Sequence, residues 1–309
     1  MMGEILFLAH RMPFPPDRGD RIRSHHLLKA LNRLAPVHVG CFADSEGERR
    51  YSHRLSRWSH TLHVELRRKP VAIAGVDALL SGKPVSLAAF SSNTMRRWIS
   101  DLCATRTIDT IVVFSGQMGQ YIPDDFSGRI IVDLCDVDSA KFEAYALAGW
   151  MPRRWIDARE GRLLAREEGR LHERADATLF VSAAERQLFV SRQEGKASRS
   201  AHIVQNGVDT DYFDPSKLTL SEQVALEGQP SFVFTGQMDY PPNVAAAKRF
   251  IDRLLPRIRT THPNALFHCV GRCPAASLTK RDGKAGIHIW GEVADMRPFL
   301  AAADMVVAP

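Results

Sequence analysis

The chain has 309 residues, of which 45% are hydrophobic and 25% charged; this is ordinary globular composition, and the length allows two domains of about 150 residues each. No apolar run approaches the roughly 20 residues that cross a bilayer, and the N-terminus lacks a signal-peptide layout, which excludes a membrane-spanning protein and predicts a cytoplasmic one. The five scattered cysteines have neither metal-ligand spacing nor the framework of a secreted disulfide protein.

The net charge of +6 is confined to the first two-thirds of the chain. Residues 1–205 hold 30 Lys and Arg against 24 Asp and Glu, whereas residues 206–309 hold 11 of each kind. This asymmetry is typical of a first part that meets an anionic partner, either a membrane surface or an acidic ligand. A basic surface that is merely solvated explains the same numbers, and both interpretations stay open.

Short apolar runs alternate with amphipathic stretches through the first 207 residues. We expect one helix with Asp20 as its N-cap and another over 87–103. Most of the apolar runs are unbroken, as in strands buried on both faces of a parallel sheet, and they lie at 4–10, 37–43, 62–66, 110–114, 129–134, 177–182 and 201–205. Strand, helix and strand in repetition predict a doubly wound α/β domain over 1–207.

The pattern restarts after a polar segment at 209–230. Helices are expected over 244–259 and 295–303. Strands are expected over 231–236, 265–271, 286–291 and 304–309. They predict a second α/β domain, over 208–309, that stops on a strand. Because a parallel sheet normally continues from such a strand through a crossover helix, we expect this domain to be truncated by several elements.

Ligands bind at the carboxyl ends of the strands in open α/β sheets, so the loops after strands are the places to look for chemistry. The loop after the first strand contains Gly19, which allows close backbone approach, and Asp20, at a helix N-terminus whose amides can hold an anion. Four arginines favour a functional loop over a plain connection: Arg11, Arg18, Arg21 and Arg23.

The loop after the first strand of the second domain has the same construction. Gly236 ends the strand, two prolines follow, and Asn243 can cap the next helix. Helix N-termini attract phosphates, so two such loops, one in each domain, suit a phosphate-bearing ligand.

Three carboxylates gather in the segment DLCDVDS, at 133–139. Two such groups in one site allow one of them to act as a general base or to hold a sugar hydroxyl. An Asp-rich turn in which Asp138 or Ser139 caps the next helix is the alternative. No histidine lies at ligand spacing here, so no metal site is expected.

A basic stripe follows Trp155, because Arg159, Arg162, Arg166 and Arg170 are spaced to share one helix face. Such a stripe suits the interface of an anionic membrane. Interleaved glutamates at 160, 167, 168 and 173 can pair with it, which favours a solvated helix face instead. No stacking aromatics accompany the basic residues, so nucleic acid is not expected as a partner.

The segment IVQNGVDTDYFDP, at 203–215, resembles the interdomain signature of GT-B glycosyltransferases of family 4. Together with FTGQMDYPPNVAAAKRF, GIHIWGEVADMRPFLAAADMVVAP and DLCDVDS, it looks most like the sugar transferases associated with bacterial exopolysaccharide and PEP-CTERM gene clusters, from Met2 to Pro309. The resemblance implies two Rossmann-like domains facing across a cleft, with Asn206 and Gly207 closing the last strand of the first. A β-hairpin turn at Asn-Gly is the alternative, and the following polar segment, which has no partner strand, argues against it.

The resemblance further implies a nucleotide-sugar donor on the C-terminal domain, a glycan or lipid-linked acceptor on the N-terminal domain, retention of anomeric configuration, and neither cofactor nor bound metal. Gly19 would lie near the transferred sugar. The other donor-binding residues that it implies are Asp20, Gly236, Gln237, Asn243, Gly271, Arg272, Gly291, Glu292 and Val293. Because acceptors in such pathways are often lipid-linked phosphates, peripheral contact of the basic N-terminal domain with the anionic inner membrane is expected.

The sequence departs from many relatives at three places. The loop at 237–243 lacks the Arg and Lys that neutralise the diphosphate, and no histidine follows the strand at 110–114, which leaves Asp136 or Asp138 to activate the acceptor. Relatives also continue beyond the position of Pro309 into a segment with two glutamates. Two alternatives to an active transferase therefore stay open: a truncated, non-catalytic nucleotide-sugar-binding remnant, and a GT-B sugar epimerase.

Overall fold

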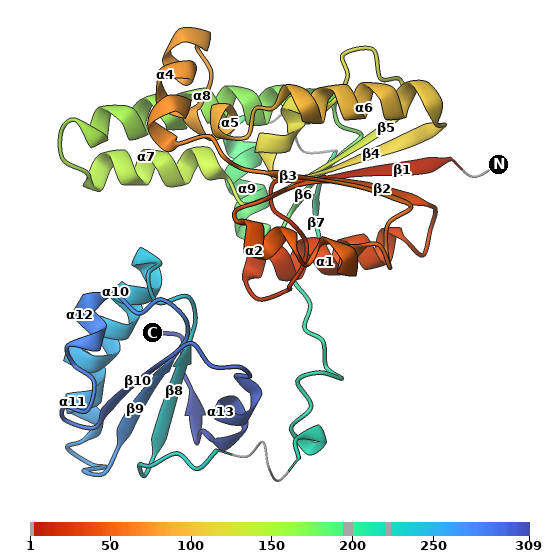
Figure 1. Ribbon diagram of the computed structural model, residues 1–309. Helices are drawn as coiled ribbons and strands as arrows, with labels where there is room; N and C mark the ends of the chain where they lie inside the picture. Colours follow the sequence, from red (N-terminus) through yellow and green to blue (C-terminus); the bar gives the residue numbers. More distant parts are fainter. Residues whose placement is uncertain (1–2, 194–199, 220–223) are drawn as a thin grey trace. The chain divides into compact units, whose positions relative to one another are not determined.

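The computed structural model describes residues 3–193, 200–219 and 224–309, and these form two compact α/β units, Met1–Asn206 and Gly207–Pro309 (Figure 1). We call them the N-terminal unit and the C-terminal unit. Each is built around its own parallel sheet. None of the helices in the described ranges is both long enough and apolar enough to cross a membrane.

The sheet of the N-terminal unit has seven described strands in the order β3-β2-β1-β4-β5-β6-β7, and all neighbours are parallel. Each overlaps an apolar run expected to be a strand, which confirms the doubly wound α/β prediction. The strands are β1 (Glu4–Ala9), β2 (Val37–Ala43), β3 (Thr61–Leu66), β4 (Ile108–Phe114), β5 (Arg129–Cys135), β6 (Ala177–Phe180) and β7 (Ala201–Ile203). The strand order reverses between β1 and β4, and ligands bind at such a switch point.

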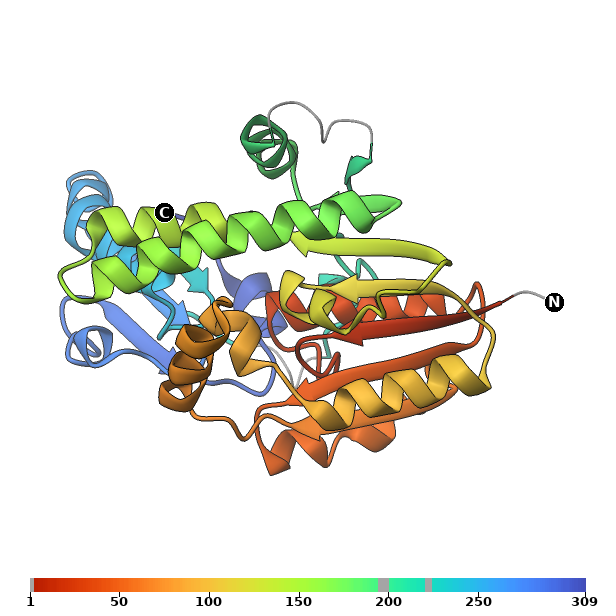
Figure 2. The same ribbon diagram turned by 90° about the horizontal axis from the view of Figure 1, so that it is seen from above.

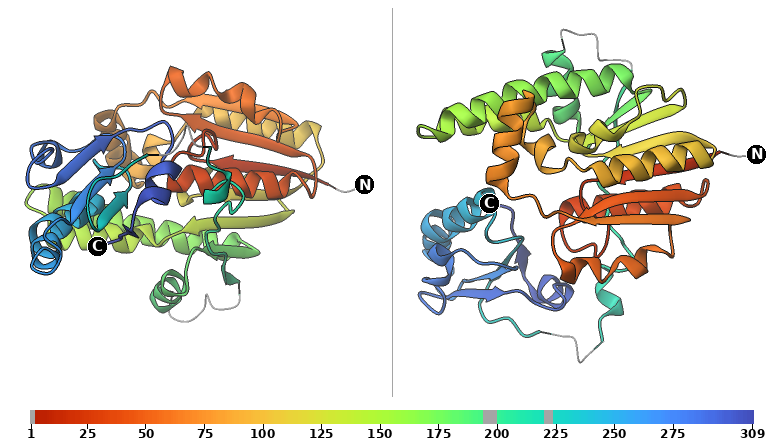
Figure 3. Two further views of the ribbon diagram at one scale, coloured as in Figure 1. Left: turned by 90° about the horizontal axis from the view of Figure 1, so that it is seen from below. Right: turned by 45° about the horizontal axis from the view of Figure 1, so that its top comes forward.

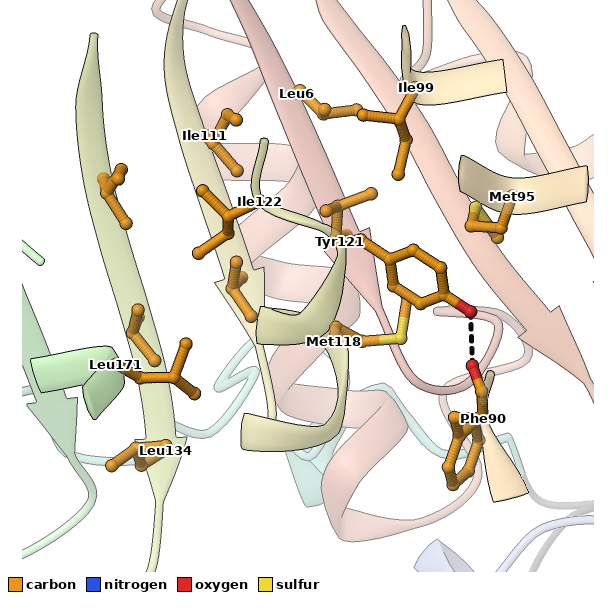
Figure 4. Close-up of a cluster of buried hydrophobic side chains, with 14 of the residues drawn as sticks. Leu6, Phe90, Met95, Ile99, Ile111, Met118, Tyr121, Ile122, Leu134 and Leu171 are labelled. Atoms are coloured by element: carbon orange, nitrogen blue, oxygen red, sulfur yellow. Dashed lines mark hydrogen bonds between the residues drawn. The ribbon is translucent and has the colours of Figure 1, made fainter. Parts of the chain in front are cut away.

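Both faces of this sheet are buried. Successive residues of a strand point to opposite faces, and accordingly Leu6 and Leu8 of β1 pack in one core cluster while Phe7 packs in another. Figure 4 shows the first cluster, where the Tyr121 hydroxyl also donates a hydrogen bond to the carbonyl of Phe90. Burial on both sides explains why β1 is an unbroken apolar run rather than an alternating one.

Helices lie on both sides of this sheet (Figures 1 and 2). They are α1 (Gly19–Leu31), α2 (Glu46–Arg49), α3 (Ser52–Leu55), α4 (Val71–Ser81), α5 (Val85–Ala89), α6 (Asn93–Thr105), α7 (Asp138–Ala148), α8 (Arg153–Arg174), α9 (Ala183–Arg192) and the 3-10 helix η1 (Gly116–Tyr121). The single helix expected over 87–103 is wrong, because it is divided into α5 and α6. Ser92 Oγ accepts from the amides of Thr94, at 3.1 Å, and Met95, at 3.2 Å, and so starts a new helix.

Helix α8 supplies carboxylates that complete the first turns of two other helices. Glu160 accepts from the amides of Val85 (2.7 Å) and Ser86 (2.8 Å) at the start of α5, and Glu168 accepts from the amide of Ser139 (2.9 Å) at the start of α7. Neither α5 nor α7 has a capping side chain of its own at its N-cap position. The expectation that Asp138 or Ser139 caps α7 is therefore wrong, since first-turn amides need an acceptor and α8 provides it.

The arginine stripe of α8 is only partly paired with neighbouring glutamates. Arg170 donates to Glu167, with a shortest distance of 2.6 Å, as expected. Arg159 instead donates to the backbone carbonyls of Ala78 (2.9 Å) and Lys83 (3.2 Å), which fixes the end of α4 to α8 (Figure 3).

The C-terminal unit has four described parallel strands in the order β10-β9-β8-β11. They are β8 (Ser231–Thr235), β9 (Leu266–Val270), β10 (Ile287–Gly291) and β11 (Met305–Val306), in the four segments where strands are expected. The helices are α10 (Pro241–Arg249), α11 (Leu255–Ile258), α12 (Ala276–Thr279) and α13 (Arg297–Ala302), with a π-helical turn at Phe250–Leu254 and a 3-10 helix η2 (Pro215–Lys217). The helix expected over 244–259 thus exists, but it starts earlier and changes its hydrogen-bond pattern midway.

Candidate functional site

Three neighbouring strands of the C-terminal unit, β8, β9 and β10, end at glycines whose backbones contact one another. Gly236 N donates to the carbonyl of Val270 at 3.2 Å, and Gly271 N donates to the carbonyl of Gly291 at 2.9 Å. A Cβ on Gly271 would lie 1.7 Å from the carbonyl oxygen of Gly236, and Gly271 has a φ of 152°. Only glycine fits at Gly271, because any side chain would collide with the neighbouring backbone. We call Gly236, Gly271 and Gly291 the glycine edge.

The loop after β8 is braced against the glycine edge by backbone and amide groups. Asn243 Nδ2 donates to the carbonyl of Gln237 at 3.0 Å, and the amide of Met238 donates to the carbonyl of Arg272 at 2.9 Å. The expectation that Asn243 caps the helix is wrong. Two prolines begin α10 at Pro241, so the N-cap position falls at Tyr240. Its amide group holds the loop instead.

The structure therefore gathers most of the expected donor-binding residues of this unit at one edge. Gly236, Gln237, Gly271 and Arg272 lie in the connected loops after β8 and β9, Gly291 is the last residue of β10, and Asn243 lies in the first turn of α10. Val293 packs beside this edge against Val233, Val270 and Phe299, and Glu292 is exposed next to it.

The other expected loop, after β1, is dominated by ion pairs. The Asp20 carboxylate accepts from Arg11 at 2.8 Å and from Arg18 at 2.8 Å, and it lies 3.4 Å from Nε2 of His10. Burial alone would raise the pKa of Asp20, but the hydrogen bonds of His10 and Arg18 and the charge of Arg11 lower it far below its ordinary value. Asp20 lies within the first turn of α1, whose N-cap position is Arg18, so the expectation that Asp20 is the N-cap is wrong. Its carboxylate is held by Arg11 and Arg18.

All four arginines expected to make this loop attractive to anions have carboxylate partners within the protein. Besides binding Asp20, Arg11 donates to Asp44 at 3.1 Å, and Arg21 bonds to Glu48 at 2.5 Å. The fourth, Arg23, pairs with Asp133. Gly19, at the start of α1, has no atom within 4 Å of where a Cβ would stand, so the backbone is open there. Gly19 and Asp20 thus lie together, with the surrounding charge largely neutralised.

Asp133 belongs to β5 rather than to the loop after it, contrary to its grouping in a cluster of three carboxylates. It is buried and accepts from Arg23 Nε at 2.8 Å and from Arg23 Nη2 at 3.1 Å. The same guanidinium donates to the carbonyl of Val204 at 2.7 Å and to Oδ1 of Asn206 at 2.9 Å. Arg23 therefore fixes Asn206 to the rest of the N-terminal unit. Both Asn206 and Gly207 are exposed.

Asp136 and Asp138, the expected catalytic residues, line one small pocket at the ends of β4 and β5. Gln117, Glu167 and Glu168 also line it. Burial raises the pKa of Asp136, and the nearby carboxylates of Glu185 and Asp138 add to the effect.

Glu168 is a candidate that the sequence analysis missed. Burial raises its pKa to about 7, although hydrogen bonds from Ser139 act in the opposite direction. A carboxyl group that titrates near neutrality beside Asp138 can donate or accept a proton. The sequence holds a usable signal, because the spacing of Glu160, Leu164, Glu168 and Leu171 places these glutamates on the same helix face as two leucines. In the structure all four residues are buried.

His10 is the second missed residue, directly after β1 at the switch point of the sheet. It is buried against the ring of Phe114, with centroids 5.8 Å apart, and its Nδ1 atom has no hydrogen-bond partner among the described residues. Burial lowers the pKa of His10 below its ordinary value, although the hydrogen bond with Asp20 acts in the opposite direction. The sequence signal for His10 is its position directly after the first strand, because ligands bind at the carboxyl ends of the strands in open α/β sheets. In the described parts of both units, no group of three or more His, Cys, Asp or Glu is placed to hold a metal ion.

Residues 229–309 match the sequence family described as Glycosyl transferases group 1. This stretch contains β8 to β11 and therefore the whole glycine edge. None of the curated proteins matches the chain in sequence.

Several solved structures are similar to the chain in fold. Anabaena HepE in complex with UDP-glucose is 14% identical, with a TM-score of 0.57 over 99% of this chain and 73% of that chain. The catalytic domain of Arabidopsis thaliana starch synthase IV, bound to ADP and acarbose, is 12% identical, with a TM-score of 0.59 over 99% and 78%. An E. coli trehalose-6-phosphate structure bound with UDP-2-fluoro glucose is 11% identical, with a TM-score of 0.56 over 98% and 77%. At these identities the likeness concerns the fold, and it confirms the predicted GT-B fold class.

Proposed function

We propose that the chain is a retaining glycosyltransferase that moves a sugar from a nucleotide-diphosphate donor to a glycan or lipid-linked acceptor. The pathway we assign to it is exopolysaccharide or other cell-envelope synthesis, of the kind encoded in PEP-CTERM gene clusters. The observation that carries the proposal is the glycine edge, which lies inside the stretch that matches Glycosyl transferases group 1. The nucleotide ligands of the similar solved structures support a nucleotide-sugar donor.

The chemistry asks the donor side to stabilise a leaving diphosphate. Transfer breaks the bond between C1 of the sugar and a diphosphate oxygen, forms a bond from C1 to the acceptor oxygen, and passes the acceptor proton to the departing diphosphate. Backbone amides that are fixed before the reaction stabilise such developing negative charge well. We assign this role to Gly236 and Gln237, whose loop is held by Asn243, and place the nucleoside near Gly271, Arg272 and the turn at 291–293.

We assign the acceptor side to the N-terminal unit. Asp136 or Asp138 would activate the acceptor hydroxyl, and Glu168 lines the same pocket. Gly19 and Asp20 would border the transferred sugar. In this proposal the enzyme needs neither a metal nor a cofactor, and it works as a peripheral protein on the cytoplasmic side of the inner membrane.

The test is a calorimetric titration of the purified chain with UDP-glucose and ADP-glucose, followed by an assay for release of the nucleoside diphosphate. We expect one of the two donors to bind, and Gly271→Ala to weaken that binding strongly. Gly283→Ala is the matched control, because Gly283 also has a positive φ, of 69°, but has open space around its Cβ position. Proton NMR of the glycoside product, which reports the anomeric configuration, tests retention.

Each other outcome has its own meaning. If neither these donors nor their GDP and dTDP counterparts bind, the proposal is wrong. Binding without release of nucleoside diphosphate, in the presence of lipid-linked and glycan acceptors, would identify a nucleotide-sugar-binding remnant. Release of a free, configurationally changed sugar would identify an epimerase.

A further inference from the structure

Helix α4 carries apolar side chains on its inner side and on most of its outer side, and Asp77 is its single charged residue. Its inner residues Ala74 and Ala78 pack against Ala88 of α5. On its outer side Ile73 and Leu80 are 52% and 84% exposed, and Val76 and Leu79 are also exposed. An outer face with four exposed large apolar side chains is suited to an apolar environment, which the described residues do not provide.

The turn between α7 and α8 carries a second exposed apolar set. Trp150 is 89% exposed and Met151 is 72% exposed, and Leu147, Trp155 and Ile156 on either side of them are exposed as well. Contiguous apolar surface of this kind is uncommon on a monomeric protein and marks a site of interaction.

The two sets belong to the same end of the N-terminal unit. Arg159 binds the backbone carbonyls of Ala78 and Lys83, so the last turn of α4 is fixed to α8 (Figure 3). Ile156 precedes Arg159 by three residues, which is about 4.5 Å along the axis of α8. We call the outer face of α4 together with residues 147–156 the apolar end.

The charge around the apolar end is mostly positive. Residues 68–83 and 144–156 contain five Lys and Arg but a single acidic residue, Asp77, and Lys69 pairs with it at 2.8 Å. The side chains of Arg68 and Arg153 are 78% and 80% exposed, and they lie 3.6 Å from Glu46 and 3.5 Å from Asp157, respectively. Tryptophan beside arginine, on an apolar surface without free carboxylates, is the composition that binds the interface of an anionic bilayer.

We infer that the apolar end is a docking surface for an anionic lipid bilayer. The outer face of α4 and the turn at Trp150 enter the headgroup region, and cations such as Arg154 and Lys83 contact lipid phosphates. A second copy of the chain fits less well, because two surfaces of the same positive charge repel each other. The surface differs from the arginine stripe, whose Arg159 and Arg170 are already bound within the protein.

This inference deepens the proposed function and rests on it for one point only, that a lipid-linked acceptor would be met at the bilayer. Binding to vesicles needs no donor and no turnover. Failure of docking would leave a transferase with another acceptor, whereas failure of donor binding would leave a lipid-binding protein, so the two failures are distinguishable.

The experiment is flotation of the full chain with vesicles of phosphatidylcholine alone and of phosphatidylcholine mixed with phosphatidylglycerol. We expect binding to the mixed vesicles only, weakening as salt is raised. Leu80→Glu combined with Trp150→Glu should reduce binding at least about tenfold, and Arg154→Glu should reduce it less. The matched controls are Leu34→Glu, at a leucine 66% exposed outside the apolar end, and Arg33→Glu. Circular dichroism melts and donor titrations should be the same for all variants.

Three results would overturn the inference. The first is an unchanged chain that does not float with the mixed vesicles. The second is a loss of binding as large for Leu34→Glu as for the double variant, which would show a non-specific effect. The third is a dimer, measured by light scattering, that the double variant dissociates, which would mean that a second copy covers this surface.

Discussion

The two units hold their strand-end loops in place by opposite means. In the N-terminal unit, charged groups neutralise one another: Asp20 holds Arg11 and Arg18, and buried Asp133 holds Arg23. In the C-terminal unit, backbone contacts backbone at the glycine edge, with few charges involved. The loops of the N-terminal unit therefore depend on charge balance, whereas the glycine edge of the C-terminal unit depends on the absence of side chains. Substitutions that act on charge or on space should therefore affect the units selectively.

The largest effect is expected where charge balance is removed from the interior of the N-terminal unit. Arg23→Met leaves the carboxylate of Asp133, which is 1% exposed, without its cation. Breaking a buried pair from one side costs about 3–5 kcal/mol in the free energy of unfolding. Urea unfolding followed by tryptophan fluorescence measures it.

Arg49→Met is the control for this prediction. Arg49 pairs with Glu46 on the surface, where both side chains are 52% exposed, so its loss should cost less than about 0.5 kcal/mol. Equal losses for Arg23→Met and Arg49→Met would contradict the idea that buried charge balance stabilises this unit.

Next in size is a pH effect at Glu168, a buried acid with no ion pair to a residue in the described ranges. Its pKa is about 7 in the folded chain, above its value in the unfolded chain, because burial disfavours the charged form. The folded chain therefore keeps a proton that the unfolded chain releases, and stability falls as pH rises from about 4.5 to 7, by about 3 kcal/mol. Glu168→Gln should flatten this dependence in urea unfolding measured across the window. The neighbouring Glu167→Gln should leave it in place, and a slope unchanged by Glu168→Gln would refute the assignment.

A steric change should act on the C-terminal unit. Gly271→Ala places a Cβ against the carbonyl of Gly236 and should destabilise this unit by about 2–3 kcal/mol, because both backbone strain and overlap must be relieved. Gly283→Ala, at a positive φ without a neighbour, should cost only about 1–2 kcal/mol. Thermal unfolding monitored at Trp290 compares them, and a Gly271 variant as stable as the Gly283 variant would show that the glycine edge tolerates side chains.

The smallest effect is expected at the amide that braces the loop after β8. Asn243→Ala removes the hydrogen bond to the carbonyl of Gln237 and should cost about 1 kcal/mol. If the loop holds the diphosphate, donor affinity should fall about fivefold, measured by calorimetry. An unchanged affinity would separate this loop from the donor site while leaving the glycine edge in question.

Features carried by local patterns were predictable. The apolar runs at the centres of β1 and β8 are unbroken because each strand is buried on both faces, and this burial is visible in a short window of sequence. The loop with Gly236 was predictable for a similar reason, since ligands of open α/β sheets bind at the carboxyl ends of the strands, whereas Gly271 and Gly291 were implied only by the family resemblance.

Features that depend on partners far along the chain were not predictable in the same way. Asp20 looked like a helix cap, but Arg11 and Arg18 fold back onto it. Glu168 looked like a member of a solvated helix face, yet it is 5% exposed and binds Ser139, 29 residues earlier. Short-range spacing shows which groups are available, but the choice among partners is made by tertiary packing.

Helix α8 has a consequence for how the N-terminal unit gains its order. Helices α5, with five residues, and α7, with eleven, are too short to be stable in water on their own. Their first amides also have no acceptor until α8 packs against them and supplies Glu160 and Glu168. Segments that are separated by dozens of residues must therefore form and open together. Hydrogen exchange should show 85–89, 138–148 and 153–174 behaving as one cooperative folding unit.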